Sequence, residues 1–363
     1  MPPQNPRARS APPPGAHLPR SAPSRSAPPR PGGPPPTPSR RRRRPGRVLG
    51  AILGVLVLLV VGFALYVDQS LNRVAALTDY PGRIADTPGT NWLIVGSDSR
   101  AGLTGSQEAD LSTGDVAGAS GQRTDTIMLL HIPALGSSAQ PTLVSLPRDS
   151  AVPIPGKGRN KINAAYSFGG PQLLVQTVET VTGVHVDHYA EIGFAGFAGI
   201  VDAIGGVQLC PKDPIDDPLA GLHIQAGCQQ FDGAKALGYV RTRHTPRGDL
   251  DRVAHQREFL SALIAKAASP AVLLNPFRLV PLATSAPKAI TVDDGDHVWQ
   301  LARLGWTMRS LTGGNAVTTT VPIAGFGRLS DGSSTVLWNH DRASQLFGAL
   351  AQDTPVPADA LGP

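Results

Sequence analysis

The segment NWLIVGSDSR, residues 91–100, decides the fold of this chain. Its first half contains an apolar run, WLIVG at 92–96, with the length and composition of a buried β-strand. Its second half is polar, and Asp98 and Arg100 follow the predicted strand directly. Because ligands of open α/β sheets bind beyond the carboxyl ends of the strands, this segment predicts a sheet and a candidate site at its edge.

Apolar runs with a strand pattern alternate along the chain with segments of helical periodicity. The further strand patterns are DTIMLLHI (125–132), TLVSL (142–146), HYAEI (188–192) and GVQLC (206–210). Helical periodicity occurs at 172–183, 194–205, 251–269, much of 293–312, and 341–351. This alternation predicts an α/β fold in which helices flank a central mixed sheet. The Gly-, Ser- and Thr-rich residues 101–122 are expected to form a surface loop between the first two strands.

Arginine and aspartate recur together in five short segments. They are GSDSR (96–100), RTDT (123–126), LPRDS (146–150), VRTRH (240–244) and GDLDRVAHQ (248–256). Arginine suits planar, bidentate binding of phosphate, and two carboxylates beside phosphate are a usual way to hold Mg²⁺. The residue types therefore predict a magnesium-assisted pyrophosphate site. Its cations are Arg100, Arg123, Arg148, Arg241, Arg243 and Arg252, and its acids are Asp98, Asp125, Asp149 and Asp249.

The direction of one strand is a condition for a single site. The clusters at 96–100 and 146–150 follow predicted strands, whereas Arg123 and Asp125 precede theirs. These two residues reach a shared site only if their strand runs antiparallel to the other two. The sequence leaves the order of the strands open.

The N-terminal part of the chain has the composition of a tail and a membrane anchor. Residues 1–47 contain eleven arginines, 16 prolines and no acid, so we expect them to be disordered. An uncharged stretch, VLGAILGVLVLLVVGFALYV at 48–67, then follows the basic run 40–44. Twenty helical residues rise about 30 Å, the thickness of a bilayer core. A cleaved signal peptide is disfavoured because the tail and the apolar run are too long.

The distribution of charge predicts the orientation of this anchor. The basic run places the N-terminus in the cytoplasm and the larger part of the chain outside the cell membrane. The chain has 33 Lys+Arg and 27 Asp+Glu. Without the eleven arginines of the tail, 22 basic and 27 acidic residues remain, which gives a net charge of −5. Such a domain lacks the basic footprint of a nucleic-acid binder. The expected parts are a tail (1–47), a single membrane helix (48–67), a juxtamembrane segment (68–90) and an extracytoplasmic α/β domain (91–355).

The chain has two cysteines, Cys210 and Cys228, both in the outer region. An even number of cysteines in an oxidising compartment predicts one disulfide. The segment between them is rich in Pro, Asp and Gly, which is typical of an excursion that needs a covalent link. A catalytic cysteine would require a histidine pattern, and His223 alone does not supply one.

The order GSDSR, RTDT, LPRDS, KINAAYSFGG, ALGYVRTRH and GDLDRVAHQ resembles that of the LytR-CpsA-Psr family of cell-wall glycopolymer ligases. The match runs from about residue 91 to residue 266, and the cysteine pair is similar to that of actinobacterial members. The resemblance implies transfer of a glycan-1-phosphate from a polyprenyl-pyrophosphate carrier to peptidoglycan. It also implies a fold with an apolar lipid pocket. The implied partners are the lipid-linked glycan, peptidoglycan and the membrane.

The resemblance also implies roles for individual residues. Asp98 and Asp125 match aspartates near the magnesium, for which manganese is a possible substitute. The candidate pyrophosphate ligands are Arg123, Arg148, Lys161, Arg241, Arg243 and Arg252, together with Arg100, which the residue types alone suggest. The candidate catalytic residues are Arg148, Asp149, Arg241, Arg243, Asp249, Arg252 and Gln256. Because many members carry another arginine in place of His255, a phosphate contact at that position is either lost or dependent on pH.

Alternatives remain open at this stage. The acceptor's proton would pass to a carboxylate, Asp149 or Asp249, and the sequence does not decide between them. The same site would serve a hydrolase of the pyrophosphate, and a non-catalytic lipid-binding regulator is a third class that the intact aspartates disfavour. The apolar faces of 172–183 and 194–205 are expected mainly to pack in the hydrophobic core. Lining a prenyl pocket is the secondary expectation for them. The sequence does not identify the polymer.

Overall fold

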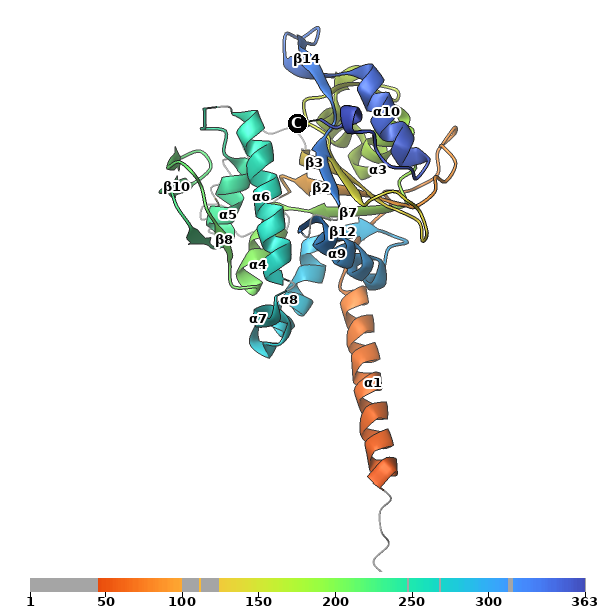
Figure 1. Ribbon diagram of the computed structural model, residues 1–363, viewed down its shortest axis with the longest axis vertical. Helices are drawn as coiled ribbons and strands as arrows, with labels where there is room; N and C mark the ends of the chain where they lie inside the picture. Colours follow the sequence, from red (N-terminus) through yellow and green to blue (C-terminus); the bar gives the residue numbers. More distant parts are fainter. Residues whose placement is uncertain are drawn as a thin grey trace, which may run out of the picture. The chain divides into compact units, whose positions relative to one another are not determined.

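The structure is a computed structural model that describes residues 45–99, 111, 124–246, 248–267, 269–312 and 316–362 of the 363-residue chain. The predicted tail up to residue 44, Arg100, Arg123 and nearly all of the predicted loop 101–122 lie outside the described residues. The first described element is helix α1, Pro45–Gln69 (orange in Figure 1). Its segment Leu49–Gln69 is long and apolar enough to cross a membrane, which matches the predicted apolar helix.

A seven-stranded mixed sheet forms the centre of the fold, in the order β1-β12-β7-β2-β3-β4-β13. In that order the strands are Asn72–Val74, Ile290–Asp293, His188–Ile192, Thr90–Ser97, Thr124–Ile132, Thr142–Ser145 and Val317–Thr320. Strand β3 runs antiparallel to both β2 and β4, whereas β2 is parallel to β7 and β4 is parallel to β13. The predicted α/β fold with a mixed sheet is confirmed.

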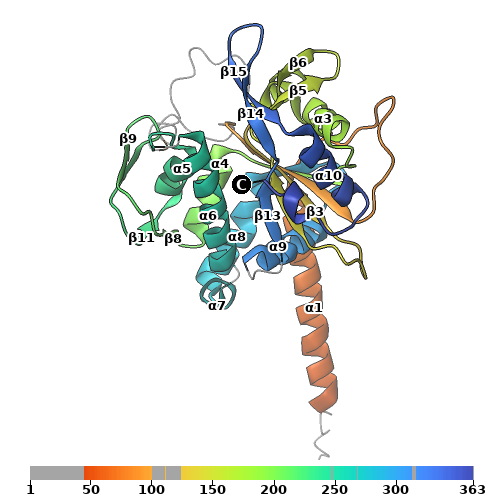
Figure 2. The ribbon, with the colours of Figure 1, turned by 45° about the horizontal axis from the view of Figure 1, so that its top comes forward.

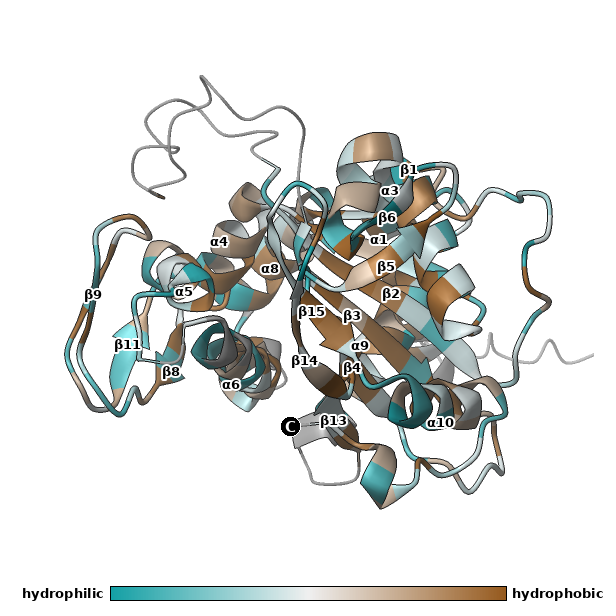
Figure 3. Ribbon diagram, turned by 90° about the horizontal axis from the view of Figure 1, so that it is seen from above, coloured by the Kyte–Doolittle hydropathy of each residue, from teal (hydrophilic) through white to brown (hydrophobic). Residues whose placement is uncertain are grey.

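Helices cover both faces of the sheet (Figure 1). One face packs against α3 (Ile162–Thr182) and α10 (His340–Ala351), and the other packs against α6 (Asp249–Ala267) and α9 (Val298–Thr312). In β2, Leu93 and Val95 pack on the face covered by α3 and α10, and Trp92 and Ile94 pack on the face covered by α6 and α9, because successive strand residues point to opposite faces. Burial on both faces explains why this strand is a continuous apolar run, brown in Figure 3.

A second core lies beside the sheet, around α4 (Phe194–Ala203) and α5 (Gly233–Arg241). Strands β8 (Val207–Leu209) and β11 (Gln229–Phe231) pair antiparallel, and the predicted disulfide Cys210–Cys228 joins the chain next to this pair. The disulfide therefore closes the Pro- and Asp-rich excursion at its base. Within it, β9 and β10 form a hairpin; their bounds are Ile215–Asp217 and Leu222–Ile224.

Two more hairpins lie at the end of the sheet where the candidate site is found. They are β5–β6 and β14–β15, which lie side by side in Figure 2. Their strands are Ala151–Ile154, Gly158–Lys161, Ile323–Arg328 and Ser334–Trp338. The remaining elements are α7 (Pro270–Leu273), α8 (Pro276–Ala289) and the 3₁₀ helix η1 (Ala358–Ala360).

Candidate functional site

The strand directions bring the clusters of the first three motifs to one end of the sheet. Because β3 is antiparallel to β2 and β4, its start lies beside the ends of both neighbours. Ser97 pairs with Thr124 after a register shift, so Asp98, just after β2, and Asp125, near the start of β3, lie at the same end of the sheet. The amide of Leu146, just after β4, donates to Ile127 O at 2.8 Å. The condition that the sequence left open is therefore met for Asp125.

Arg148 is the centre of a network of ion pairs at this edge. Its Nη1 pairs with Asp125 Oδ1, and its Nε lies 3.4 Å from Asp149 Oδ2. Lys161 Nζ lies 2.8 Å from Asp149 Oδ1. The four side chains are only 18–29% exposed, yet each retains some accessible surface. Two cations and two carboxylates thus form a compact cluster that a solvent-borne ligand can reach.

Backbone hydrogen bonds hold the LPRDS segment in place for this network. Ser150 N donates to Pro147 O at 2.9 Å, which closes a tight turn around Arg148 and Asp149. The amide of Ile162, at the start of α3, donates to Ser150 O at 2.9 Å. In the β5–β6 hairpin Lys161 pairs with Ala151, and this register carries the lysine back to Asp149. The lysine of the KINAAY motif therefore pairs directly with the aspartate of the LPRDS motif.

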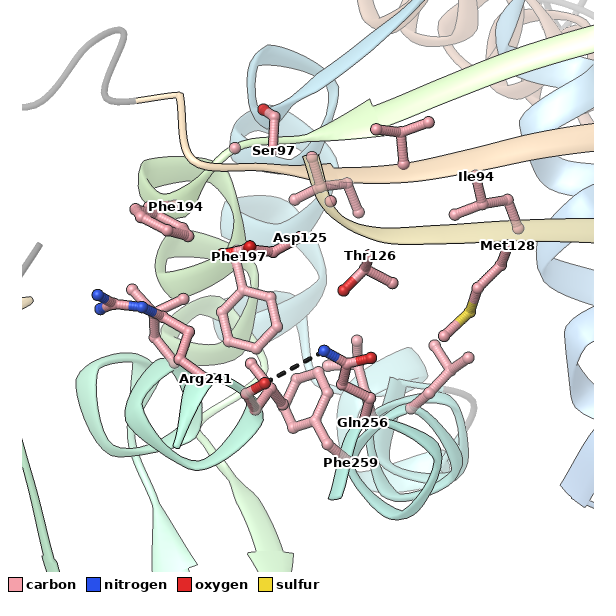
Figure 4. A pocket seen from close by; sticks show the side chains of 18 of the residues that line it. Ile94, Ser97, Asp125, Thr126, Met128, Phe194, Phe197, Arg241, Gln256 and Phe259 are labelled. Atoms are coloured by element: carbon pink, nitrogen blue, oxygen red, sulfur yellow. Dashed lines mark hydrogen bonds between the residues drawn. The ribbon is translucent and has the colours of Figure 1, made fainter. Parts of the chain in front are cut away.

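An apolar pocket of about 160 Å³ opens beside this network (Figure 4). It lies between the sheet and helices α4, α5, α6 and α9. Aromatic rings form much of its wall, and the rings of Phe197 and Phe259 stack at 4.6 Å. The charged side chains that line it are Asp125, Arg241 and Arg252. An apolar cavity that meets a few charged groups fits an amphipathic ligand with an anionic end.

The later motifs supply one wall of this apolar pocket. The Arg241 guanidinium lies 4.7 Å from the ring centre of Phe194, a cation–π contact, and its Nη1 donates to Leu111 O at 3.2 Å. Arg252 is almost fully buried, and Gln256 donates through Nε2 to Val240 O at 3.2 Å. Arg241, Arg252 and Gln256 are thus brought together at the pocket, as the motif order predicted.

A second, more polar pocket of about 530 Å³ lies over β3, β4 and β13. We call it the polar pocket. It shares Asp125, Arg252 and Gln256 with the apolar pocket, and Arg148 and Asp149 line it alone. The two pockets therefore meet at β3 and α6. The residues that line only the polar pocket include Ser145, Arg257, Thr320, Ile323, Phe326 and Val336.

Some predicted residues do not join this arrangement. Arg243 is exposed and lines neither pocket. His255 stacks on the Tyr239 ring at 4.2 Å instead of facing a pocket, and burial lowers its pKa, so it stays neutral near pH 7. Nothing in this position supports a pH-dependent phosphate contact. The side chain of Asp249 lies outside the described part of the chain, as do Arg100 and Arg123.

A buried carboxylate below the site is a feature that the sequence analysis missed. Glu191 on β7 accepts hydrogen bonds from Tyr166 Oη at 2.9 Å and from Tyr189 Oη at 2.7 Å. Burial, the Glu191 carboxylate and, to a smaller extent, Asp98 raise the pKa of Tyr166 above its usual range. The sequence feature that could have indicated this cluster is the glutamate inside the predicted strand HYAEI.

Asp98 and Asp125 are the residues that the sequence analysis named as candidate metal ligands. Among the described residues, no group of three or more His, Cys, Asp or Glu side chains could hold a metal ion. Mg²⁺ needs only one or two carboxylates, because water and phosphate oxygens complete its shell. Asp125 lines both pockets, whereas Asp98, which directly follows β2, lines neither of them.

Comparison with known proteins agrees with the motif order. The profile of the LytR_cpsA_psr family matches residues 68–352. The probable cell wall biosynthesis protein LcpB of Corynebacterium glutamicum is 53% identical over 318 residues, which cover 86% of this chain and 74% of LcpB. The polyisoprenyl-teichoic acid–peptidoglycan teichoic acid transferase TagU of Bacillus anthracis is 30% identical over 61% of this chain and 72% of its own length. The structure of a LytR-Csp2A-Psr enzyme from Actinomyces oris shares the fold with a TM-score of 0.58 and 24% identity, over 77% of this chain and 96% of that one.

Proposed function

Because the chain belongs to the LytR_cpsA_psr family, we propose that it is a membrane-anchored transferase that joins a cell-wall glycopolymer to peptidoglycan. The donor would be a glycan linked to a polyprenyl pyrophosphate. The observation that carries this proposal is the junction of the apolar pocket with the arginines and aspartates around Arg148. A polyprenyl pyrophosphate has the same two parts, an apolar chain and a multiply charged anion.

The apolar pocket would bind the first part of the prenyl chain. Phe194, Phe197 and Phe259 give it an aromatic lining from α4 and α6. Its volume of about 160 Å³ is below the roughly 300–1,000 Å³ of pockets that enclose a drug-sized ligand. The remainder of a long prenyl chain would therefore stay outside it, in the membrane.

The arginines would bind the pyrophosphate where the two pockets meet. Arg252 lines both pockets, Arg148 lies on the polar side and Arg241 on the apolar side. Guanidinium groups on three sides can neutralise charge on both phosphates and on the leaving oxygen. Mg²⁺ or Mn²⁺ at Asp98 and Asp125, when bound, would supply further positive charge beside the phosphate oxygens.

The reaction would be a phosphoryl transfer. A hydroxyl oxygen of the acceptor attacks the phosphorus that carries the glycan, and the bond from this phosphorus to the bridging oxygen breaks. The bridging oxygen leaves with polyprenyl phosphate, and the hydroxyl proton passes to a carboxylate. Asp149 lines the polar pocket and is the described candidate for this base, with Asp249 as the alternative.

The proposed orientation places this reaction outside the cell membrane. The arginine-rich residues 1–47 favour a cytoplasmic N-terminus, and the apolar segment Leu49–Gln69 is long enough to span the bilayer. The disulfide between Cys210 and Cys228 supports this orientation, since disulfides persist in oxidising compartments.

A reconstituted reaction tests the proposal. Full-length protein in detergent micelles is incubated with a polyprenyl-pyrophosphate-linked glycan and Mg²⁺, with and without peptidoglycan oligomers, and the products are identified by mass. We expect the oligomer to gain the glycan and one phosphate while polyprenyl phosphate is released. Release of glycan phosphate to water only, in the presence of oligomer, would indicate a hydrolase. Binding of the donor without turnover would indicate a regulator.

A further inference from the structure

We propose that the polar pocket is a carbohydrate subsite that binds a sugar ring of the acceptor glycan, with Phe326 as the surface on which the ring stacks. This inference rests on the proposed function and deepens it, because it locates the acceptor in that transfer. The C-terminal hairpin β14–β15 that carries Phe326 has no part in the family motifs described above. The subsite would give this hairpin a role in binding.

The size and lining of the polar pocket fit a sugar. Its volume of about 530 Å³ lies in the range of roughly 300–1,000 Å³ that is usual for small-molecule sites. Ser145, on its floor, is only 6% exposed, and its hydroxyl has no hydrogen-bond partner among the described residues. Buried polar groups are normally paired, and this hydroxyl would pair with a sugar hydroxyl once the Ser145 side chain turned into the pocket. Arg257, which donates to Thr320 Oγ1, adds a second polar group.

The position of Phe326 is fixed relative to the reacting groups. In the β14–β15 hairpin Phe326 pairs with Val336. The amide of Val336 donates to Asp149 O at 2.9 Å, and Trp338 Nε1 donates to Ser150 Oγ at 2.8 Å. The hairpin is therefore hydrogen-bonded directly to the LPRDS segment. As a result, the ring that lines the pocket stands one strand away from Asp149.

Phe326 is an exposed aromatic residue that lines the polar pocket, unlike the exposed Phe277 and Trp306. Single exposed apolar side chains are common on protein surfaces and need no function. Phe277 and Trp306 are 88% and 75% exposed and line neither pocket. Phe326 is 72% exposed and lines the polar pocket. An aromatic face beside polar groups suits a pyranose ring, which has an apolar C–H face and a rim of hydroxyl groups.

The arrangement of the two pockets assigns this sugar to the acceptor. The attacking and leaving oxygens of a phosphoryl transfer lie roughly in line on opposite sides of the phosphorus. If the prenyl phosphate leaves on the side of the apolar pocket, the attacking hydroxyl approaches from the side of the polar pocket. Asp125, Arg252 and Gln256, which both pockets share, would then surround the phosphorus. The hydroxyl oxygen bonds to phosphorus, the bridging oxygen leaves, and the hydroxyl proton passes to Asp149 on the acceptor side.

Substitution of Phe326 tests this subsite in the full-length protein in micelles. We expect Phe326→Ala to raise the KM for peptidoglycan oligomers about tenfold, as loss of one aromatic contact would. The KM for the lipid-linked donor and the melting temperature should stay unchanged, because the ring is exposed. Phe326→Trp keeps a stacking surface and should restore the acceptor KM. Phe277→Ala, which removes an even more exposed ring that lines neither pocket, should change neither KM.

Three outcomes would overturn the subsite. An unchanged acceptor KM in Phe326→Ala would show that the ring does not bind the acceptor, and a raised donor KM would assign the pocket to the donor's glycan. Direct titration of the protein with peptidoglycan oligomers, without donor, separates this inference from the proposed function. If the wild type transfers nothing but binds oligomers more tightly than Phe326→Ala, the subsite stands and the transferase proposal fails. Absence of oligomer binding to the wild type would refute the subsite.

Discussion

Replacement of Arg148 by alanine should reduce turnover far more than it reduces stability, and Arg83→Ala should do the reverse. Both arginines are mostly buried, with 18% and 14% of their side chains exposed, and both pair with carboxylates. The two arginines differ in the surroundings of the carboxylates with which they pair. Arg148 pairs with Asp125 and Asp149, which line the polar pocket, whereas Arg83 pairs with Glu179, which is fully buried.

The expected magnitudes follow from these surroundings. The carboxylates paired with Arg148 keep 21–29% of their side-chain surface, so water can solvate them when Arg148 is removed. A cost of about 1 kcal/mol would lower the melting temperature by only about 2–4 °C in a domain of this size. Loss of a donor that stabilises charge in the transition state costs about 10²–10³ in kcat. Removal of Arg83 leaves the Glu179 charge buried, which costs about 3–5 kcal/mol. Tyr80 and the Val186 amide still donate to Glu179, so the lower figure is expected.

Two measurements on each variant separate the roles. Melting curves give the stability, and single-turnover rates with saturating lipid-linked donor and oligomer give the chemical step per folded molecule. Arg148→Lys is informative as well, because lysine keeps the charge but loses the planar fork, so its turnover should remain impaired. A large loss of stability with near-normal transfer in Arg148→Ala would refute the reasoning and assign Arg148 to the scaffold.

Three further predictions concern the metal, the disulfide and the topology. Asp98→Asn and Asp125→Asn should each lower turnover by orders of magnitude at limiting Mg²⁺ while the fold is kept; wild-type rates in both, with unchanged circular dichroism, would exclude these ligands. Replacement of Cys210 and Cys228 by serine should lower the free energy of unfolding by about 3 kcal/mol, since the bond closes an 18-residue separation. Denaturant titration measures this loss, and an unchanged midpoint would contradict it. An export-dependent reporter enzyme fused after the last residue should be active, whereas activity of a cytoplasm-dependent reporter at the same position would reverse the proposed orientation.

The sequence predicted those parts of the fold whose signals are local. The run WLIVG at 92–96 indicated a strand because its residues are buried on both faces, and 251–269 indicated a helix through its apolar stripe. Helix α8 gave no such signal, because Pro281 and Pro287 interrupt its pattern. The 172–183 segment joins the core as expected, whereas the 194–205 segment also lines the apolar pocket through its first turn.

The candidate site was predictable in composition but not in geometry. The motifs named Arg148, Asp149 and Lys161, yet their contacts depend on strand order and on the β5–β6 register, which are long-range properties of the fold. The polar pocket was missed for the same reason. Its walls come from β4 and from β13 and the β14–β15 hairpin, which follow β4 by more than a hundred residues in the chain.

The ion pairs around Arg148 also explain how an arginine-rich site can exist before an anionic ligand arrives. Unpaired cations held close together would repel one another, and partly buried charge is costly without a partner. Here Asp125 and Asp149 neutralise Arg148, and Asp149 also pairs with Lys161. A pyrophosphate that binds Arg148 must therefore compete with these carboxylates for the same guanidinium. In the proposed transferase these aspartates would have two consequences: they would neutralise Arg148 in the absence of substrate, and they would make the affinity for the anion depend on the strength of the Arg148–Asp125 ion pair.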